Sequence, residues 1–356
     1  MKAGLRKAAA LGLALLMGAS VSAWADHHGK GLAYVTNQDK GVSVISLETF
    51  AVVGTIDVEA NEPRGIGVTR DGKYLVTANR ESGDVSVIDT ATRKIVKHIP
   101  IGMNPEFVRV FGDFAYVSYE PSAKAGPPPK PGEKDDGDDG AEKLPAGIAV
   151  IDLNNLEVVR TIMSGPETEG IEFSHDGKKM LVTNEGDNTI TVYDMKTGKL
   201  MHKVDTHRLG DRPRGIKASP DGKHYVVTLE YGDKLLLLDR KFKPVKTVST
   251  AKGPYGVAFD KSGKHLYVAA FKDKQLQIFN GKTLTLEKTV PIGDRCWHFT
   301  FTPDEKHLML ACGRSQEVLV LDAKSFEQVG HVKDLNLPWG IITYPKSMGS
   351  LDAPSR

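Results

Sequence analysis

Seven segments of the chain share a short frame in which one residue changes its chemical type. In its full form the frame is Pro, a variable residue, Gly and an apolar run, as in "PRGIGVT" at Pro63 and "PYGVAFD" at Pro254. In chain order the variable residues are Arg64, Glu106, Glu169, Arg214, Tyr255, Trp297 and Trp339. Arginines bind anions, paired carboxyls can exchange protons, and aromatic rings stack on planar groups. We therefore take these seven as the candidate ligand-binding residues.

The elements that must position these residues repeat at intervals of about 42 residues. Most frame segments are followed by a turn such as "TRDGK" or "SPDGK", in which Asp and Gly favour a tight hairpin. Three further apolar runs follow, rich in β-branched and aromatic residues and bounded by turn formers. Each unit thus predicts four short antiparallel strands, and the frame begins the first of them.

Seven such units predict an all-β, seven-bladed β-propeller. The first blade lacks its inner strand, because the chain enters it at "GLAYVTN", a second-strand sequence. The missing inner strand is Pro338 to Tyr344, so we expect the C-terminal strand to join the N-terminal blade and close the ring. Deletion of the residues after Gly330 should then unfold all blades of the protein together.

Chain order of the blades is also their order around the axis, which groups the variable residues by chemistry. The three aromatic residues should form one arc of a channel mouth, and the four charged residues should face them. Pro fixes φ and Gly permits close backbone approach, so the residue between them is placed at the rim. Two alternatives stay open here: the indoles could pack against neighbouring loops, and the Arg and Glu residues could simply pair with one another.

Residues that recur in most blades are expected to serve the fold. A set of aspartates ends the third strands, where a short acceptor can cap the next turn. They are Asp89, Asp152, Asp194, Asp239 and Asp322. His224, His265 and His307 share one register after the inner hairpin, and we do not expect them to be ligands.

The N-terminus has the pattern of a secretory leader, with Lys2, Arg6 and Lys7 before a short apolar stretch and a cleavage site at Ala23-Trp24-Ala25. Its removal changes the formal charge from +2 to −1, which gives no support to nucleic-acid or anionic-membrane binding. We expect a periplasmic monomer without a membrane span. The predicted organisation is a signal peptide at 1–25, a propeller at 26–345 with a disordered insertion at 120–146, and a tail at 346–356.

Three features invite a metal or disulfide interpretation. Cys296 and Cys312 fall opposite one another in one hairpin, which favours a disulfide in an oxidising compartment, with a metal site of Cys296 and His298 as the alternative. The insertion contains "DDGDDG", but a glycine occupies a position where a calcium loop needs an oxygen ligand. A mature terminus at Asp26-His27-His28 could bind copper. Our site prediction contains no metal.

The chain also resembles a known family. "AYVTN" at Ala33, "VSVIDTATRKIV" at Val85 and the "PRG" and "SPDGK" elements are similar to the YVTN-repeat, YncE-type periplasmic propellers over nearly all of the mature chain. The resemblance implies the propeller fold, and it implies single-stranded DNA as one partner to consider. Similar propellers also serve as lactonases and as haem- or quinone-linked subunits.

We therefore predict a periplasmic binding protein that recognises a planar ligand, peptide or protein partner at the channel mouth. The alternatives are an accessory subunit or carrier in a redox or tetrapyrrole pathway, and a lactonase-like enzyme that uses Glu106 and Glu169 as paired carboxyls. Binding is preferred to catalysis because no nucleophile motif, phosphate loop or zinc triad appears. The cofactor is left open.

Overall fold

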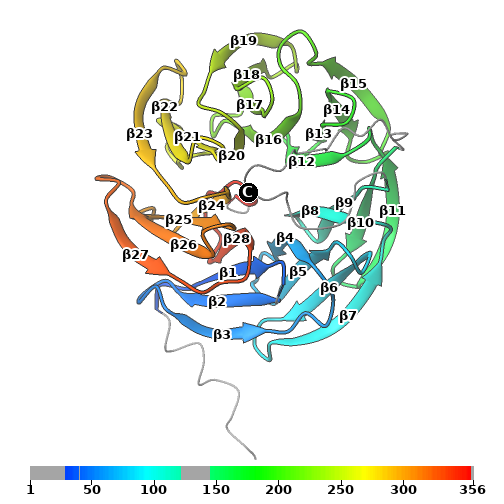
Figure 1. The fold of residues 1–356 in the computed structure, drawn as a ribbon. Coiled ribbons are helices and arrows are strands. Elements are labelled where there is room, and N and C mark those ends of the chain that lie inside the picture. Colours follow the sequence, from blue (N-terminus) through cyan, green and yellow to red (C-terminus); the bar gives the residue numbers. More distant parts are fainter. Residues whose placement is uncertain (1–28, 40, 122–144, 354–356) are drawn as a thin grey trace, which may run out of the picture.

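The computed structural model describes residues 29–39, 41–121 and 145–353. They form seven four-stranded antiparallel sheets around one axis (Figure 1). These residues contain no helix, and in them no helical segment of membrane-spanning length and hydropathy occurs. The predicted all-β, seven-bladed propeller is confirmed. The proposed signal peptide, the Asp26-His27-His28 terminus and most of the 120–146 insertion lie outside the described residues.

The strands of each blade are given from the axis outward. Blade 1 has β28 (Pro338–Tyr344), β1 (Leu32–Asn37), β2 (Val42–Ser46) and β3 (Val52–Ile56). Blade 2 has β4 (Pro63–Val68), β5 (Tyr74–Asn79), β6 (Asp84–Asp89) and β7 (Lys94–Pro100). Blade 3 has β8 (Pro105–Phe111), β9 (Phe114–Tyr119), β10 (Gly147–Asp152) and β11 (Glu157–Met163). Blade 4 has β12 (Thr168–Phe173), β13 (Lys179–Asn184), β14 (Thr189–Asp194) and β15 (Leu200–Asp205).

The remaining blades follow the same plan. Blade 5 has β16 (Pro213–Ala218), β17 (His224–Leu229), β18 (Lys234–Asp239) and β19 (Pro244–Ser249). Blade 6 has β20 (Pro254–Phe259), β21 (His265–Ala270), β22 (Gln275–Asn280) and β23 (Leu286–Pro291). Blade 7 has β24 (Cys296–Phe301), β25 (His307–Cys312), β26 (Glu317–Asp322) and β27 (Gln328–Val332).

The last strand closes the ring as predicted. β28 pairs antiparallel with β1, with Leu32 opposite Tyr344 and Val35 opposite Ile341. Figure 1 shows β28 at the inner edge of the sheet that begins with β1, although some 300 residues separate the two strands in the chain. The inner three strands of each blade are mostly buried and the outer strands mostly exposed, so the apolar core lies between neighbouring sheets.

The turn chemistry also follows the sequence. In the first inner hairpin, Asp71 accepts the Thr69 hydroxyl at 2.6 Å and the Lys73 amide at 3.0 Å, while Gly72 has φ of +73°. The recurring third-strand aspartates cap the next turn as predicted. For example, Asp89 accepts the Thr92 amide at 2.7 Å and Asp194 accepts the Thr197 amide at 2.8 Å.

Each of the seven inner strands carries a β-bulge at the frame position. In blade 2, Pro63 lies opposite Asn79 but Ile66 lies opposite Thr77, so the inner strand has one residue more than its partner in between. The same shift occurs in all seven blades. A bulge re-aims a side chain out of the regular alternation, and here the re-aimed residue is the variable one.

Threonines of the second strand connect the bulges to the neighbouring blade by hydrogen bonds. The Thr228 hydroxyl accepts the Gly215 amide at 2.8 Å and donates to the Tyr255 carbonyl of the next blade at 2.8 Å. Thr183 makes the same pair of bonds, to Gly170 and Arg214, at 2.7 and 2.6 Å. The bulge position is therefore fixed both within its blade and between blades.

Candidate ligand-binding site at the propeller axis

All seven predicted site residues lie at the bulges, at the start of the inner strands. The side chains of Arg64 and Arg214 are 11% and 12% exposed. The other five residues are only 2% to 6% exposed. The predicted residues are thus mostly buried at one end of the axis, and their role in binding stays a prediction.

The arginines and glutamates pair with one another, which is one of the alternatives that the sequence leaves open. Nη1 of Arg64 lies 2.7 Å from Oε1 of Glu106, and its Nη2 lies 2.6 Å from Oε1 of Glu62. Arg80 lies 3.7 Å from each of these two carboxylates. These four residues form the first ionic group.

A second ionic group surrounds Arg214. Its guanidinium contacts Glu169, and its Nε lies 2.8 Å from Glu185 and 2.7 Å from Glu230. Burial disfavours its charge, but the surrounding carboxylates more than offset this and hold the pKa of Arg214 well above its usual range. Arg214 is therefore the central cation of this group.

Two further cations complete the second group. Arg212 lies 2.7 Å from Glu185, and Lys272 lies 3.1 Å from Glu230. Burial raises the pKa of Glu230, but Arg214, Arg212 and Lys272 outweigh it and lower that pKa to about 2. Glu230 is consequently ionised throughout the physiological range.

We call the two ionic groups together with Glu120 the rim cluster. It consists of Glu62, Arg64, Arg80, Glu106, Glu120, Glu169, Glu185, Arg212, Arg214, Glu230 and Lys272. Five consecutive blades, from blade 2 to blade 6, contribute to it. The frame does not include a second set of positions in the rim cluster, namely the residue that directly follows the second strand of a blade. Applying the same test of variation there would reveal Arg80, Glu120, Glu185 and Glu230.

Glu120 has a special place in the rim cluster. It is 3% exposed, and its Oε1 has no hydrogen-bond partner. Burial, together with the nearby negative charges of Glu169, Glu106 and Glu185, raises the pKa of Glu120 well above its usual value. Burial also raises the pKa of Glu169, to about 8. These effects favour the protonated form of Glu120, in a rim cluster whose carboxyls outnumber its cations by one.

An aromatic layer adjoins the rim cluster. We define it as Phe107, Tyr255, His298 and Trp339. The imidazole of His298 lies 4.3 Å from the ring centroid of Trp339, 5.4 Å from that of Tyr255 and 6.4 Å from that of Phe107. The Tyr255 hydroxyl donates to Glu169 at 3.3 Å, and the Arg214 guanidinium lies 4.9 Å from the Tyr255 ring. Phe107 and His298 replace the frame glycine in two blades, a departure that our sequence analysis does not use.

The two tryptophans are packed. Trp339 contacts His298, and the six-membered ring of Trp297 lies where a side chain on Gly313 would be. Arg295 lies over the Trp297 ring at 6.0 Å. Tyr255 and Trp339 of the predicted aromatic arc are therefore linked through His298, and both indoles belong to the hydrophobic core.

The C-terminal tail closes the other end of the axis. Ser350 accepts the Phe299 amide at 3.0 Å and contacts Nδ1 of His298 at 3.1 Å, and Leu351 is 1% exposed. The tail carbonyls of Leu351 and Asp352 accept from Arg109 and Lys217, which lie on two different inner strands. Because the tail contacts inner strands of three blades, it lies at the axis, near the centre of Figure 1.

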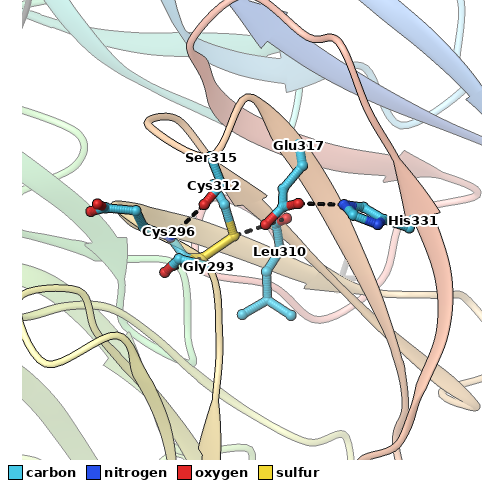
Figure 2. Close-up of a disulfide and its surroundings, with 8 residues drawn as sticks. Gly293, Cys296, Leu310, Cys312, Ser315, Glu317 and His331 are labelled. Atoms are coloured by element: carbon cyan, nitrogen blue, oxygen red, sulfur yellow. Dashed lines mark hydrogen bonds and ion pairs between the residues drawn. A yellow bond between two sulfur atoms is a disulfide. The ribbon is translucent and has the colours of Figure 1, made fainter.

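Cys296 and Cys312 form a disulfide, as the sequence favours. They lie directly opposite one another at the start of β24 and the end of β25 (Figure 2). The alternative metal site of Cys296 and His298 is wrong, because the sulfur atoms are bonded to each other and His298 packs among aromatic rings. Within the described residues, no group of three or more His, Cys, Asp or Glu side chains is arranged to hold a metal ion.

Comparison with known proteins adds a family resemblance and a set of similar folds. The model of the cytochrome D1 haem domain matches residues 145–295, which is less than half of the chain. Comparison with curated protein sequences finds no match.

Three solved structures illustrate the similar folds. A functionally unknown protein from Desulfotomaculum acetoxidans is 17% identical, with a TM-score of 0.73 over 91% of this chain and 100% of that one. The periplasmic gluconolactonase PpgL of Pseudomonas aeruginosa is 14% identical, with a TM-score of 0.72 over 88% and 98%. The dihydro-haem d1 dehydrogenase NirN is 16% identical, with a TM-score of 0.63 over 87% and 74%.

At such identities the likeness establishes the fold and nothing finer. The molecule is a seven-bladed β-propeller with a buried ionic cluster at one end of its axis and its own tail at the other. It shares this fold with proteins of haem metabolism and with lactonases.

Proposed function

We propose that this chain is an exported, periplasmic binding protein that recognises a small ligand, peptide or protein partner at the rim cluster. The observation that carries the proposal is the concentration of eleven ionisable side chains at one end of the axis. Burying a charge costs several kcal/mol per ion unless pairing compensates this cost. Apolar residues of similar size often stabilise a protein at least as much as a buried ion pair does. Perturbed ionisable groups cluster at functional sites.

The two ends of the axis differ in a way that supports this choice. At the tail end, the side chains of Arg109 and Lys217 are engaged by carbonyl groups of the chain's own C-terminal segment. At the rim end, buried oxygens of three carboxyls, those of Glu62, Glu106 and Glu120, lack hydrogen-bond partners, whereas at the tail end one such oxygen does, Oδ2 of Asp352. Unsatisfied buried acceptors favour a binding role for the rim end.

An exported location is part of the proposal. It is supported by the leader pattern of residues 1–25 and by the Cys296–Cys312 disulfide, because such bonds persist in oxidising compartments. Single-stranded DNA fits the rim cluster poorly, because the carboxyls of the cluster outnumber its cations and would repel the phosphates of the DNA.

The tetrapyrrole alternative can be tested against the packing of His298. Its Nε2 is buried without a hydrogen-bond partner, as expected of a nitrogen that could ligate iron. Burial lowers the pKa of His298 to about 3, so the imidazole is neutral. However, the rings of Trp339, Tyr255 and Phe107 occupy the space around it at centroid distances of 4.3 to 6.4 Å. These residues, packed in this way, do not fit an axially ligated haem.

The lactonase-like alternative has less support than binding. Glu106 and Glu169, the carboxyls it would use, are ion-paired with Arg64 and Arg214. Burial raises the pKa of Glu106, but Arg64 and Arg80 outweigh it and lower that pKa, which makes Glu106 a poor general base. Of the two carboxyls, only Glu169 keeps a raised pKa.

Native mass spectrometry of the protein purified from the periplasm of its own host tests the proposal. We expect a bound small molecule or partner on the wild-type protein and its loss from Arg64→Lys, which keeps the charge but removes the two-pronged contact with Glu62 and Glu106. Arg208→Lys, at an exposed arginine, is the matched control. A wild-type protein without a bound species, or equal occupancy in Arg64→Lys, contradicts the proposal.

A further inference from the structure

Three carboxyls between the two ionic groups of the rim cluster have acceptor capacity to spare. Oε2 of Glu106 and Oε1 of Glu120 are buried and have no hydrogen-bond partner. Oε2 of Glu169 accepts one hydrogen bond, 3.3 Å long, from Tyr255. A carboxylate oxygen can accept two hydrogen bonds, and a buried acceptor left without one is unfavourable.

These three carboxyls come from neighbouring blades and have the same charge when ionised. Glu106 starts β8, Glu120 follows β9 and Glu169 lies at the start of β12. Their arginine partners lie on the outer sides, since Arg64 belongs to blade 2 and Arg214 to blade 5. The middle of the arc, at Glu120, is therefore the place in the rim cluster where a further cation would be stabilised.

The kind of cation follows from what surrounds the carboxyls. The described residues contain no group arranged to hold a metal ion. The adjoining aromatic layer already receives one organic cation, the guanidinium of Arg214, at 4.9 Å from the Tyr255 ring. Aromatic faces attract ammonium and guanidinium groups, and several N–H donors on one such group could satisfy acceptors on different blades.

We propose that the rim cluster receives a primary ammonium or guanidinium group between Glu106, Glu120 and Glu169. The inference rests on the proposed function above, that the rim cluster is a binding site, and adds the chemical class of what it binds. The cation is carried either by a free amine or by a basic side chain of a peptide.

Binding of the cation should displace a proton from the rim cluster. Apart from burial, the charges that act most strongly on Glu120 are those of the carboxyls of Glu169, Glu106 and Glu185 and of the Arg80 guanidinium. With a cation beside it, ionised Glu120 is stabilised and its proton is released. A neutral ligand or an anion would not cause this release.

Isothermal titration calorimetry of the full mature chain at pH 7, in two buffers with different ionisation enthalpies, tests the inference. The probes are putrescine, agmatine and the blocked pentapeptide Gly-Gly-Lys-Gly-Gly, with the Gln analogue of the peptide as the neutral control. We expect binding of at least one cationic probe with proton release and no binding of the Gln peptide. Selective binding of the free amines or of the Lys peptide identifies the source of the cation.

Variants locate the site. Glu120→Gln preserves the shape of the protonated carboxyl. It should weaken binding of the cationic probe at least tenfold and abolish proton release. Glu48→Gln, the same change at an exposed residue, should bind like the wild type. Unchanged binding in Glu120→Gln, or binding without proton release, overturns the inference.

The calorimetric result also separates this inference from the proposed function. If no cationic probe binds while the protein from its host carries a species that Arg64→Lys loses, the cation class is wrong and the rim cluster is still a binding site. If the host protein carries nothing and no probe binds, both are wrong.

Discussion

At the residue scale, the decisive feature is the identity of the side chain at each bulge. The frame predicts correctly which seven residues share this position, because proline and glycine at fixed places in most blades mark a backbone constraint, the bulge, that all seven blades share. The frame does not reveal burial. Arg64 and Arg214 are nearly enclosed because carboxylates just before an inner strand or just after a second strand, such as Glu62 and Glu230, close around them.

The unpaired carboxyl leads to a pH prediction that belongs to this scale. Because burial raises the pKa of Glu120 in the folded protein, the folded state holds its proton at pH values where the unfolded chain has lost it. Stability should thus fall as pH rises above about 4.5, at no more than about 1.4 kcal/mol per pH unit for one proton. In Glu120→Gln this contribution is absent, so the stability of the variant relative to that of the wild type should increase from pH 5 to pH 9.

Melting temperatures measured across that pH range check this prediction. Glu48→Gln again serves as the control, because an exposed carboxyl has no such burial penalty. A difference between Glu120→Gln and wild type that stays constant with pH would show that Glu120 is not protonated in the folded state.

At the element scale, the repeat predicts strands and turns well and the bulges not at all. Hairpins such as Thr69 to Lys73 follow from local chemistry, since Asp and Gly determine the turn directly. A bulge depends on a neighbouring blade. Gly215, for example, must lie against the Tyr255 carbonyl, which is 40 residues away in sequence, and no local pattern indicates that contact.

A glycine of the bulge provides the corresponding prediction. A β-carbon on Gly215 would lie 2.5 Å from the Tyr255 carbonyl oxygen, which is backbone and cannot move aside alone. Gly215→Ala should therefore lower the free energy of unfolding by about 1–3 kcal/mol. Chemical denaturation measures it, with Gly29→Ala as the control because nothing lies within 4 Å of Gly29. Equal stability of the two variants would mean that the bulge can shift without cost.

The tail shows a second limit of sequence analysis. Residues 346–353 lie outside the repeat, so the periodicity that identifies the strands contains no information about them. Their place at the axis arises from single contacts, such as that of Ser350 with His298 and that of Leu351 with Arg109. Only the assembled ring brings these partners together.

At the scale of the whole molecule, closure by β28 and occupation of the axis by the tail are separable. A chain that ends at Gly330 lacks β28 and should not fold cooperatively, because blade 1 then has no inner strand. A chain that ends at Pro345 keeps β28 and should fold, but with a lower melting temperature, because Leu351 and the bonds of Ser350 to β24 are lost.

Circular dichroism during heating of the two truncated chains tests this. The longer chain should melt in one sharp transition below that of the wild type, and the shorter chain should show no cooperative transition. A sharp transition in the chain that ends at Gly330 would contradict the need for closure.

Because β28 is the last strand of the chain, it also governs when the molecule can assemble. A ribosome makes the chain from its N-terminal side, so the residues of blades 2 to 7 are synthesised before those of the inner strand of blade 1. The rim residues of the first and last blades become neighbours only when residues 338–344 have been made and pair with β1. A nascent chain that stalls before that point therefore presents an open sheet edge at β1, which makes late truncation products prone to pairing with other chains.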